Sequence, residues 1–127
     1  MRRIAALIVA NLGCATVRGP EETALYYSED GAIDCGVNER PFDREGRLRQ
    51  WECVQEAQRT GRPFRVVQYE QGIDSILAMV FVSTKDGKLR SFDYDSDISG
   101  GSGPSRTTEL PCSSISSDKN GNLKCSQ

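Results

Sequence analysis

The cysteines restrict the fold of this chain more than any other feature. Five cysteines occur in 127 residues, and four of them form an even set beyond the N-terminal region: Cys35, Cys53, Cys112 and Cys125. In an oxidising compartment such a set predicts two disulfides, with three possible connectivities. Proximity along the chain favours Cys35–Cys53 and Cys112–Cys125. Each bridge is expected to stabilise the folded state by roughly 2–4 kcal/mol.

The residue types present argue against a metal site and against catalysis. No C-x-x-C pair occurs and the chain has no histidine, so every zinc site that needs imidazole is excluded. The lack of histidine also removes the commonest general base and the Ser-His and Cys-His nucleophile pairs. We therefore expect no metal, no other cofactor and no enzymatic activity.

Charge and composition limit the class of partner. The formal net charge is -2 and no block of like charges appears, so no nucleic-acid partner is expected. Apolar residues make up 37% of the chain, which is typical of one soluble domain with a modest core.

The first 13 residues have the pattern of an export signal. Arg2 and Arg3 precede a short apolar run, Ile4–Ala10, and small residues follow it. The run is far shorter than the roughly 20 residues that a membrane-spanning helix needs. Residues 1–13 are therefore predicted to be a signal peptide.

Leu12-Gly13-Cys14 resembles the lipobox of bacterial lipoproteins, in which the cysteine becomes the lipidated first residue of the mature chain. Asn11 and Leu12 depart from the usual lipobox residues, and an ordinary cut after Ala15 is the alternative. With Cys14 lipidated, residues 14–31 would be a lipid anchor and flexible tether, and residues 32–127 a single domain. Ala15 after the cysteine favours the periplasmic face of the outer membrane, by resemblance to Gram-negative lipoproteins.

One amphipathic helix is predicted between Asp43 and Gly61. Asp43 can accept hydrogen bonds from the first-turn amides, and Gly61 is a common helix stop. Apolar residues recur at every third position on one broad side of this helix: Leu48, Trp51, Val54 and Ala57. The helix is therefore expected to pack on a sheet, with Trp51 as its anchor.

After this helix the apolar period changes to two, which predicts strands. They are expected at Phe64–Tyr69, Ile76–Val82, Leu89–Tyr94 and Thr107–Leu110. Asp-Gly within 85–88 is a strong hairpin signal. The run Ile76–Val82 is apolar throughout, so it should be a central strand covered on both faces, or a strand packed at an interface. The expected fold is α+β, with one amphipathic helix packed on a four-stranded antiparallel meander.

Several motifs between Cys35 and Cys112 resemble a family of small, uncharacterised bacterial secreted proteins and lipoproteins. They are C-V-Q-E-A-Q-R-T-G-R-P-F, Y-E-Q-G-I-D-S, D-G-K-L and F-D-Y-D-S-D-I-S-G-G. The family has no assigned activity. The resemblance therefore implies export and a helix-plus-sheet outline, and it adds no catalytic residue.

Three alternating aspartates, Asp93, Asp95 and Asp97, are the first candidate site because calcium is bound by carboxylate oxygens. An EF-hand beginning at Asp93 would need glycine at Ile98 and glutamate at Pro104, so that motif is absent. The alternative is a strand that turns Asp93 and Asp95 outward while Phe92 and Tyr94 face the core, with Asp97 at the start of the following turn.

The second candidate lies in the turn after the first predicted strand of the meander, at Gln71, Gly72, Asp74 and Ser75. This turn and the segment 93–101 could meet at one end of the sheet and form a pocket. The alternative is a plain turn that needs Gly72.

These observations predict an exported, lipid-anchored cell-envelope protein that acts as a non-catalytic binding module and contacts another envelope protein. Two alternatives are a calcium-dependent binding module that uses Asp93, Asp95 and Asp97, and a periplasmic inhibitor or immunity-type protein.

Overall fold

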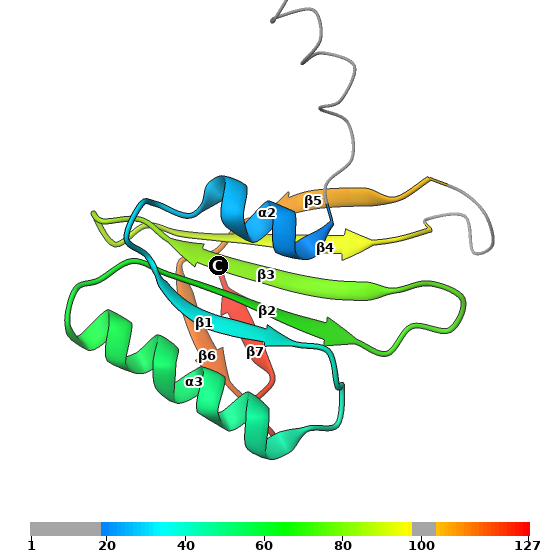
Figure 1. Cartoon of the computed structure of the whole chain (residues 1–127), viewed down its shortest axis with the longest axis horizontal. Coiled ribbons are helices and arrows are strands. Elements are labelled where there is room, and N and C mark those ends of the chain that lie inside the picture. Colours follow the sequence, from blue (N-terminus) through cyan, green and yellow to red (C-terminus); the bar gives the residue numbers. More distant parts are fainter. Residues whose placement is uncertain (1–18, 98–103) are drawn as a thin grey trace, which may run out of the picture.

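The computed structural model describes residues 19–97 and 104–127, and its elements are drawn in Figure 1. In chain order they are α2 (Pro20–Tyr27), β1 (Ile33–Asn38), α3 (Arg44–Arg59), β2 (Phe64–Glu70), β3 (Leu77–Ser83), β4 (Leu89–Asp95), β5 (Arg106–Leu110), β6 (Ser114–Ser117) and β7 (Leu123–Ser126). The described strands form a five-stranded sheet in the order β1-β2-β3-β4-β5 and a two-stranded sheet of β6 and β7.

The large sheet has apolar layers on both faces. On one face α2 packs through Ala24 against a cluster that also contains Val67, Val80, Val82 and Phe92. On the other face α3 and the β6–β7 hairpin pack against residues of opposite parity in the same strands, among them Val66 and Phe81. The prediction that Ile76–Val82 is a central strand covered on both faces is therefore confirmed (Figure 1).

The expected single helix on a four-stranded antiparallel meander is wrong in three respects. Pro20–Tyr27 forms a second helix, within the stretch 14–31 that was expected to be an anchor and tether. Ile33–Asn38 adds a fifth strand, which pairs parallel to β2 and makes the sheet mixed. The C-terminal segment forms the β6–β7 hairpin. The α+β class and the antiparallel succession from β2 to β5 agree with the prediction.

The helix α2 begins at Pro20 because proline suits the first helical position, where no backbone donor is needed. The carboxylate of Glu22 accepts a hydrogen bond from the amide of Gly19 at 3.0 Å. Glu21 and Glu22 also place negative charge at the positive end of the helix dipole. Local interactions therefore define the start of this short helix.

Contacts with distant residues hold α2 on the sheet. The Tyr69 hydroxyl donates a hydrogen bond of 2.6 Å to Glu21, and the ring of Tyr27 stacks on Phe92 with centroids 4.5 Å apart. Burial of the Tyr69 hydroxyl, with the bond to Glu21, raises the pKa of Tyr69. Helix α2 thus depends on tertiary contacts more than on an apolar stripe.

The two predicted disulfides are both present. Cys35 of β1 is joined to Cys53 of α3, with their Cα atoms 5.6 Å apart. Cys112, after β5, is joined to Cys125 of β7, with a Cα–Cα distance of 5.1 Å. The first bridge fixes the edge strand to the helix, and the second fixes the C-terminal hairpin to the end of β5.

Candidate binding notch beside β4

Strand β4 extends further than its neighbour β5, and this difference opens a gap at the edge of the sheet. The pairing of the two strands runs from Asp95 opposite Arg106 to Ser91 opposite Leu110, so Leu89 lies beyond the end of β5. The chain then leaves the sheet, because Cys112 is bonded to Cys125 of β7.

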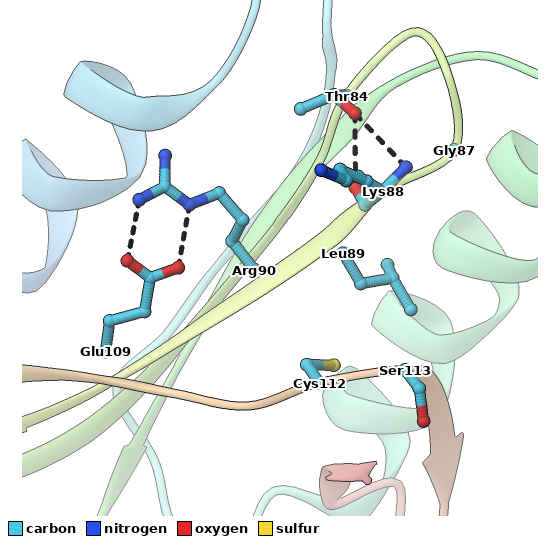
Figure 2. A pocket seen from close by; sticks show the side chains of 8 residues that line it. All are labelled: Thr84, Gly87, Lys88, Leu89, Arg90, Glu109, Cys112 and Ser113. Carbon is cyan, nitrogen blue, oxygen red and sulfur yellow. Dashed lines mark hydrogen bonds and ion pairs between the residues drawn. The ribbon is translucent and has the colours of Figure 1, made fainter.

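A cavity of about 630 Å³ occupies this gap and is shown in Figure 2. We call it the β4 notch, and its lining residues are Thr84, Gly87, Lys88, Leu89, Arg90, Glu109, Cys112 and Ser113. Its volume falls in the range of small-ligand sites, roughly 300–1,000 Å³.

One side of the β4 notch is a strong ion pair. The guanidinium of Arg90 donates two hydrogen bonds to the Glu109 carboxylate, at 2.8 Å and 2.6 Å (Figure 2). It also lies 4.6 Å from the ring centroid of Tyr27, so it connects β4, β5 and α2. The hydrogen bonds raise the pKa of Arg90 and lower the pKa of Glu109. The charge of Arg90 is therefore largely compensated.

The β3–β4 turn forms another side. The amide of Lys88 donates to the hydroxyl of Thr84 at 3.1 Å, and that hydroxyl donates to the Asp86 carboxylate. Gly87 has a φ of 86°, a conformation that favours glycine, as the Asp-Gly signal predicted. The Lys88 side chain is exposed and forms no ion pair within the described residues, so its ammonium group faces solvent.

The chemical groups of the β4 notch suit binding better than catalysis. The sulfur of Cys112 is held in a disulfide, and the Ser113 hydroxyl donates to the carbonyl of Ser126 at 2.9 Å. Asp86 lies in the β3–β4 turn and does not line the notch, and the bond from the Thr84 hydroxyl lowers its pKa, which makes this carboxylate a weaker base. These groups therefore supply a hydrogen-bonding and cationic surface, and no activated nucleophile.

The two candidate segments from the sequence lie together at the opposite end of β4 from the notch. The amide of Ser96 donates to the carbonyl of Ile76 at 2.9 Å, and the amide of Ile76 donates to the Ser96 hydroxyl at 2.7 Å. The turn at Gln71, Gly72, Asp74 and Ser75 thus joins the same end of the sheet as Asp93, Asp95 and Asp97.

Gly72 has a steric role in this turn. A Cβ atom added there would lie 2.2 Å from the carbonyl oxygen of Ser75, so no larger residue fits without a backbone shift. Ile73 beside it is 97% exposed. The turn is therefore a tight connection between β2 and β3 with an exposed tip.

The three aspartates do not converge on one point. Asp93 is exposed, Asp95 is half-buried on the same face, and Asp97 is buried with its amide donating to the Asp95 carboxylate at 3.0 Å. Desolvation of its carboxyl group, with repulsion from Asp95, raises the pKa of Asp93. Residues 19–97 and 104–127 contain no cluster of acids or cysteines suited to a metal ion. The rest of the predicted loop, 98–103, lies outside the described residues.

The strand interpretation of this segment is confirmed on its inward face. Phe92 is buried in the cluster under α2, and Tyr94 points to the same face. Glu70, at the end of β2, is separated from Asp95 by Leu77 in the pairing across the sheet. Two strand spacings amount to about 10 Å between backbones, too far for two carboxyl groups to share a proton.

Sequence reasoning missed a buried polar cluster between α3 and the β6–β7 hairpin. The Arg47 side chain is 2% exposed and donates to Asn38 Oδ1 at 3.1 Å, to Asn122 Oδ1 at 3.0 Å and to the carbonyl of Tyr69. Burial lowers the pKa of Arg47, which the carboxylate of Glu70 partly offsets. The guanidinium therefore ties the helix to β2 and to the hairpin turn.

Two glutamines extend this cluster. Gln68 donates to Gln50 Oε1 at 3.0 Å and to the carbonyl of Gly121 at 2.9 Å, and it accepts from the amide of Leu123 at 2.9 Å. Arg47 and Gln50 precede Val54 by seven and four positions, so helical spacing places all three on one face. That spacing was the available signal, but polar residues on a helix are ordinarily assigned to the solvent face.

The two disulfides indicate an oxidising, extracytoplasmic location. In the described part of the chain no helix is both long enough and apolar enough to cross a membrane. The predicted signal peptide and the lipidation site Cys14 lie outside the described residues.

Comparison with known proteins gives no relative for this chain. It matches no known family, no curated protein and no solved structure. The resemblance to small bacterial secreted proteins and lipoproteins therefore stays a prediction.

Proposed function

We propose that this protein is an exported, lipid-anchored component of the cell envelope that binds another envelope protein and catalyses no reaction. The observation that carries this proposal is the β4 notch, an open cavity at a sheet edge whose reactive groups are already bonded within the protein. A surface of this kind offers hydrogen bonds, one exposed ammonium group and apolar contacts.

The cellular setting follows from the cysteines and the N-terminal pattern. Two disulfides are stable outside the cytoplasm, and the arginines, apolar run and Gly13-Cys14 of the N-terminus are typical of an exported lipoprotein. In this proposal Cys14 carries the lipid and the domain faces the periplasm from the outer membrane. Mass spectrometry of the mature N-terminus checks the anchor, because an unmodified start at Thr16 would exclude it.

Site-specific photo-crosslinking tests the binding role. Benzoylphenylalanine in place of Ser113, at the rim of the β4 notch, should give one discrete adduct when cells expressing the full chain are irradiated. The same photo-reactive residue in place of Glu52, which is exposed on α3, is the matched control and should give none. Equal labelling from both positions, or none from either, would refute the assignment of the notch as a contact surface.

A further inference from the structure

The backbone N–H and C=O groups of successive β4 residues point alternately toward β3 and toward β5. The amide of Thr84 donates to the carbonyl of Lys88 at 2.9 Å, and the amide of Ser96 donates to the carbonyl of Ile76 at 2.9 Å. In an antiparallel ladder such bonded pairs alternate with unbonded ones. The even-numbered residues of β4 therefore bond to β3, and the odd-numbered residues turn their N–H and C=O groups toward β5.

Strand β4 has four odd-numbered residues, and β5 pairs with only three of them. These three are Ser91, Asp93 and Asp95. Continuation of the same register would bring Cys112 opposite Leu89, but the pairing ends at Leu110 and no backbone bond joins Leu89 to Cys112 in the described chain. The disulfide to β7 holds Cys112 out of the sheet. The N–H and C=O of Leu89 therefore face the β4 notch as an unpaired sheet edge.

An unpaired sheet edge is a site at which an extended chain can add a strand. The β4 notch has room for a short segment, and the side chain of Leu89 and the Cys112 disulfide give it an apolar base. Two basic groups, Lys88 and Arg90, line it against one acidic group, Glu109. Because Arg90 is paired with Glu109, the remaining charge that lines the notch is the Lys88 ammonium, which interacts with the Asp86 carboxylate at longer range and forms no close ion pair in the described residues.

We propose that the β4 notch binds a short extended peptide segment that carries an acidic side chain. Its backbone pairs with the N–H and C=O of Leu89, in the position that β5 leaves empty, and its carboxylate contacts Lys88. This inference rests on the proposed binding function and names the chemical class of the bound segment. The occupant is a segment of a partner protein.

The probes are two synthetic peptides that differ at one residue, acetyl-Thr-Val-Asp-Val-Thr-amide and the same peptide with lysine at the centre. Each is titrated into the purified, ¹⁵N-labelled full chain, and amide chemical shifts are followed by NMR. The Asp peptide should shift the Leu89 amide and bind at least about five-fold more tightly than the Lys peptide. N-methylation of the valine that precedes the aspartate should weaken binding. Strand alternation places the amide of this valine opposite Leu89 when the Asp side chain faces Lys88, and the methyl group blocks the pairing.

Charge reversal at Lys88 gives the matched test. Lys88→Glu should abolish or reverse the preference for the Asp peptide, since the Lys88 side chain is exposed and the fold does not depend on it. Lys119→Glu, at an exposed lysine of the β6–β7 turn, should leave the preference unchanged. Circular dichroism and the dispersion of the amide spectrum show whether each variant is folded.

Three results of the peptide titrations overturn the proposal. They are no shift of the Leu89 amide at peptide concentrations up to about 10 mM, equal affinity for the two peptides, and shifts centred on β1 or on the outer edge of β5. Shifts of Leu89 that grow with protein concentration alone would identify a second copy as the occupant and would also overturn it. A crosslink from position 113 without peptide binding would leave the proposed function standing and remove only this ligand class.

Discussion

Replacement of Gly121 by alanine should be among the most destabilising small substitutions in this chain. Gly121 lies in the β6–β7 turn with a φ of 83°, and an added Cβ would lie 2.6 Å from Arg47 C and from Leu48 N in the backbone of α3. This left-handed backbone conformation alone lowers the free energy of unfolding by about 1 kcal/mol when the residue has a side chain. Since helix backbone cannot yield locally, the turn must also move away from α3.

That movement would strain or break three hydrogen bonds of the polar cluster. They are Gln68 to the carbonyl of Gly121 at 2.9 Å, Arg47 to Asn122 at 3.0 Å and Leu123 to Gln68 at 2.9 Å. With roughly 1 kcal/mol for each bond, Gly121→Ala should lower the free energy of unfolding by about 3–5 kcal/mol in total.

Gly87→Ala is the matched control. Gly87 has a similar φ of 86°, but nothing lies within 4 Å of an added Cβ atom. Its substitution should therefore cost only the conformational part, about 1 kcal/mol. Urea unfolding with intact disulfides, followed by the fluorescence of Trp51 on α3, measures both values. If the two variants differ by less than about 1 kcal/mol, the close contact between the turn and α3 is refuted.

Three further predictions concern the disulfides, the acids and calcium. Replacing Cys35 and Cys53 by alanine, or Cys112 and Cys125, should each lower the free energy of unfolding by about 3 kcal/mol in urea titrations, because the bridges span 18 and 13 residues; no loss for either pair would contradict this. The folded-state pKa of Asp93 is raised above the usual 3.8, so its ionisation opposes folding as the pH rises through that range. Asp93→Asn should therefore unfold at higher urea concentration than the wild type at pH 7, and the difference should vanish below about pH 3; an advantage that persists in acid would contradict this. Thermal melts in calcium and in chelator should agree within about 1 °C, since a bound ion would raise the melting temperature; a calcium-dependent rise would revive the calcium-dependent alternative.

The elements with strong local signals were predictable from the sequence. The helix expected at 43–61 is observed as Arg44–Arg59, and the Asp43 carboxylate accepts a bond from the amide of Gly46 at 3.0 Å. The strands β2 to β5 fall within one residue of their expected limits, because alternating apolar residues and the Asp-Gly turn act over short distances. The disulfide pairing followed from proximity in the chain.

The missed elements α2 and β1 lack a regular apolar pattern and depend on distant partners. Ala24 is the only buried residue of α2 in the apolar cluster, and the helix is held by the contacts of Glu21 and Tyr27 with residues far along the chain. In β1 the pairing with β2 shifts between Asp34 and Val37, so no alternating pattern survives in the sequence. Local patterns carry no information about such contacts.

The candidate site, like the missed elements, could not be predicted from local sequence patterns. Three acids at alternate positions, Asp93, Asp95 and Asp97, attract notice in the sequence. In the structure Asp93 and Asp95 lie on one face of β4, as alternate residues of a strand do, and Asp97 follows the end of that strand. The β4 notch arises where the pairing of β4 with β5 stops at Leu110 and a disulfide diverts the chain. The point at which two strands stop pairing depends on tertiary contacts. The sequence around Lys88 and Leu89 therefore does not predict that the pairing of β4 with β5 ends beside them.

Amide hydrogen exchange at Leu89 tests the central claim most directly. In the full chain alone, the Leu89 amide should exchange rapidly for a residue within a strand, because its N–H faces the β4 notch without a partner. A saturating concentration of the Asp peptide should slow that exchange at least about ten-fold and leave Ser91, which is already paired with Leu110, nearly unchanged. An amide at Leu89 that is already protected without peptide, or whose exchange does not respond to it, would contradict the account.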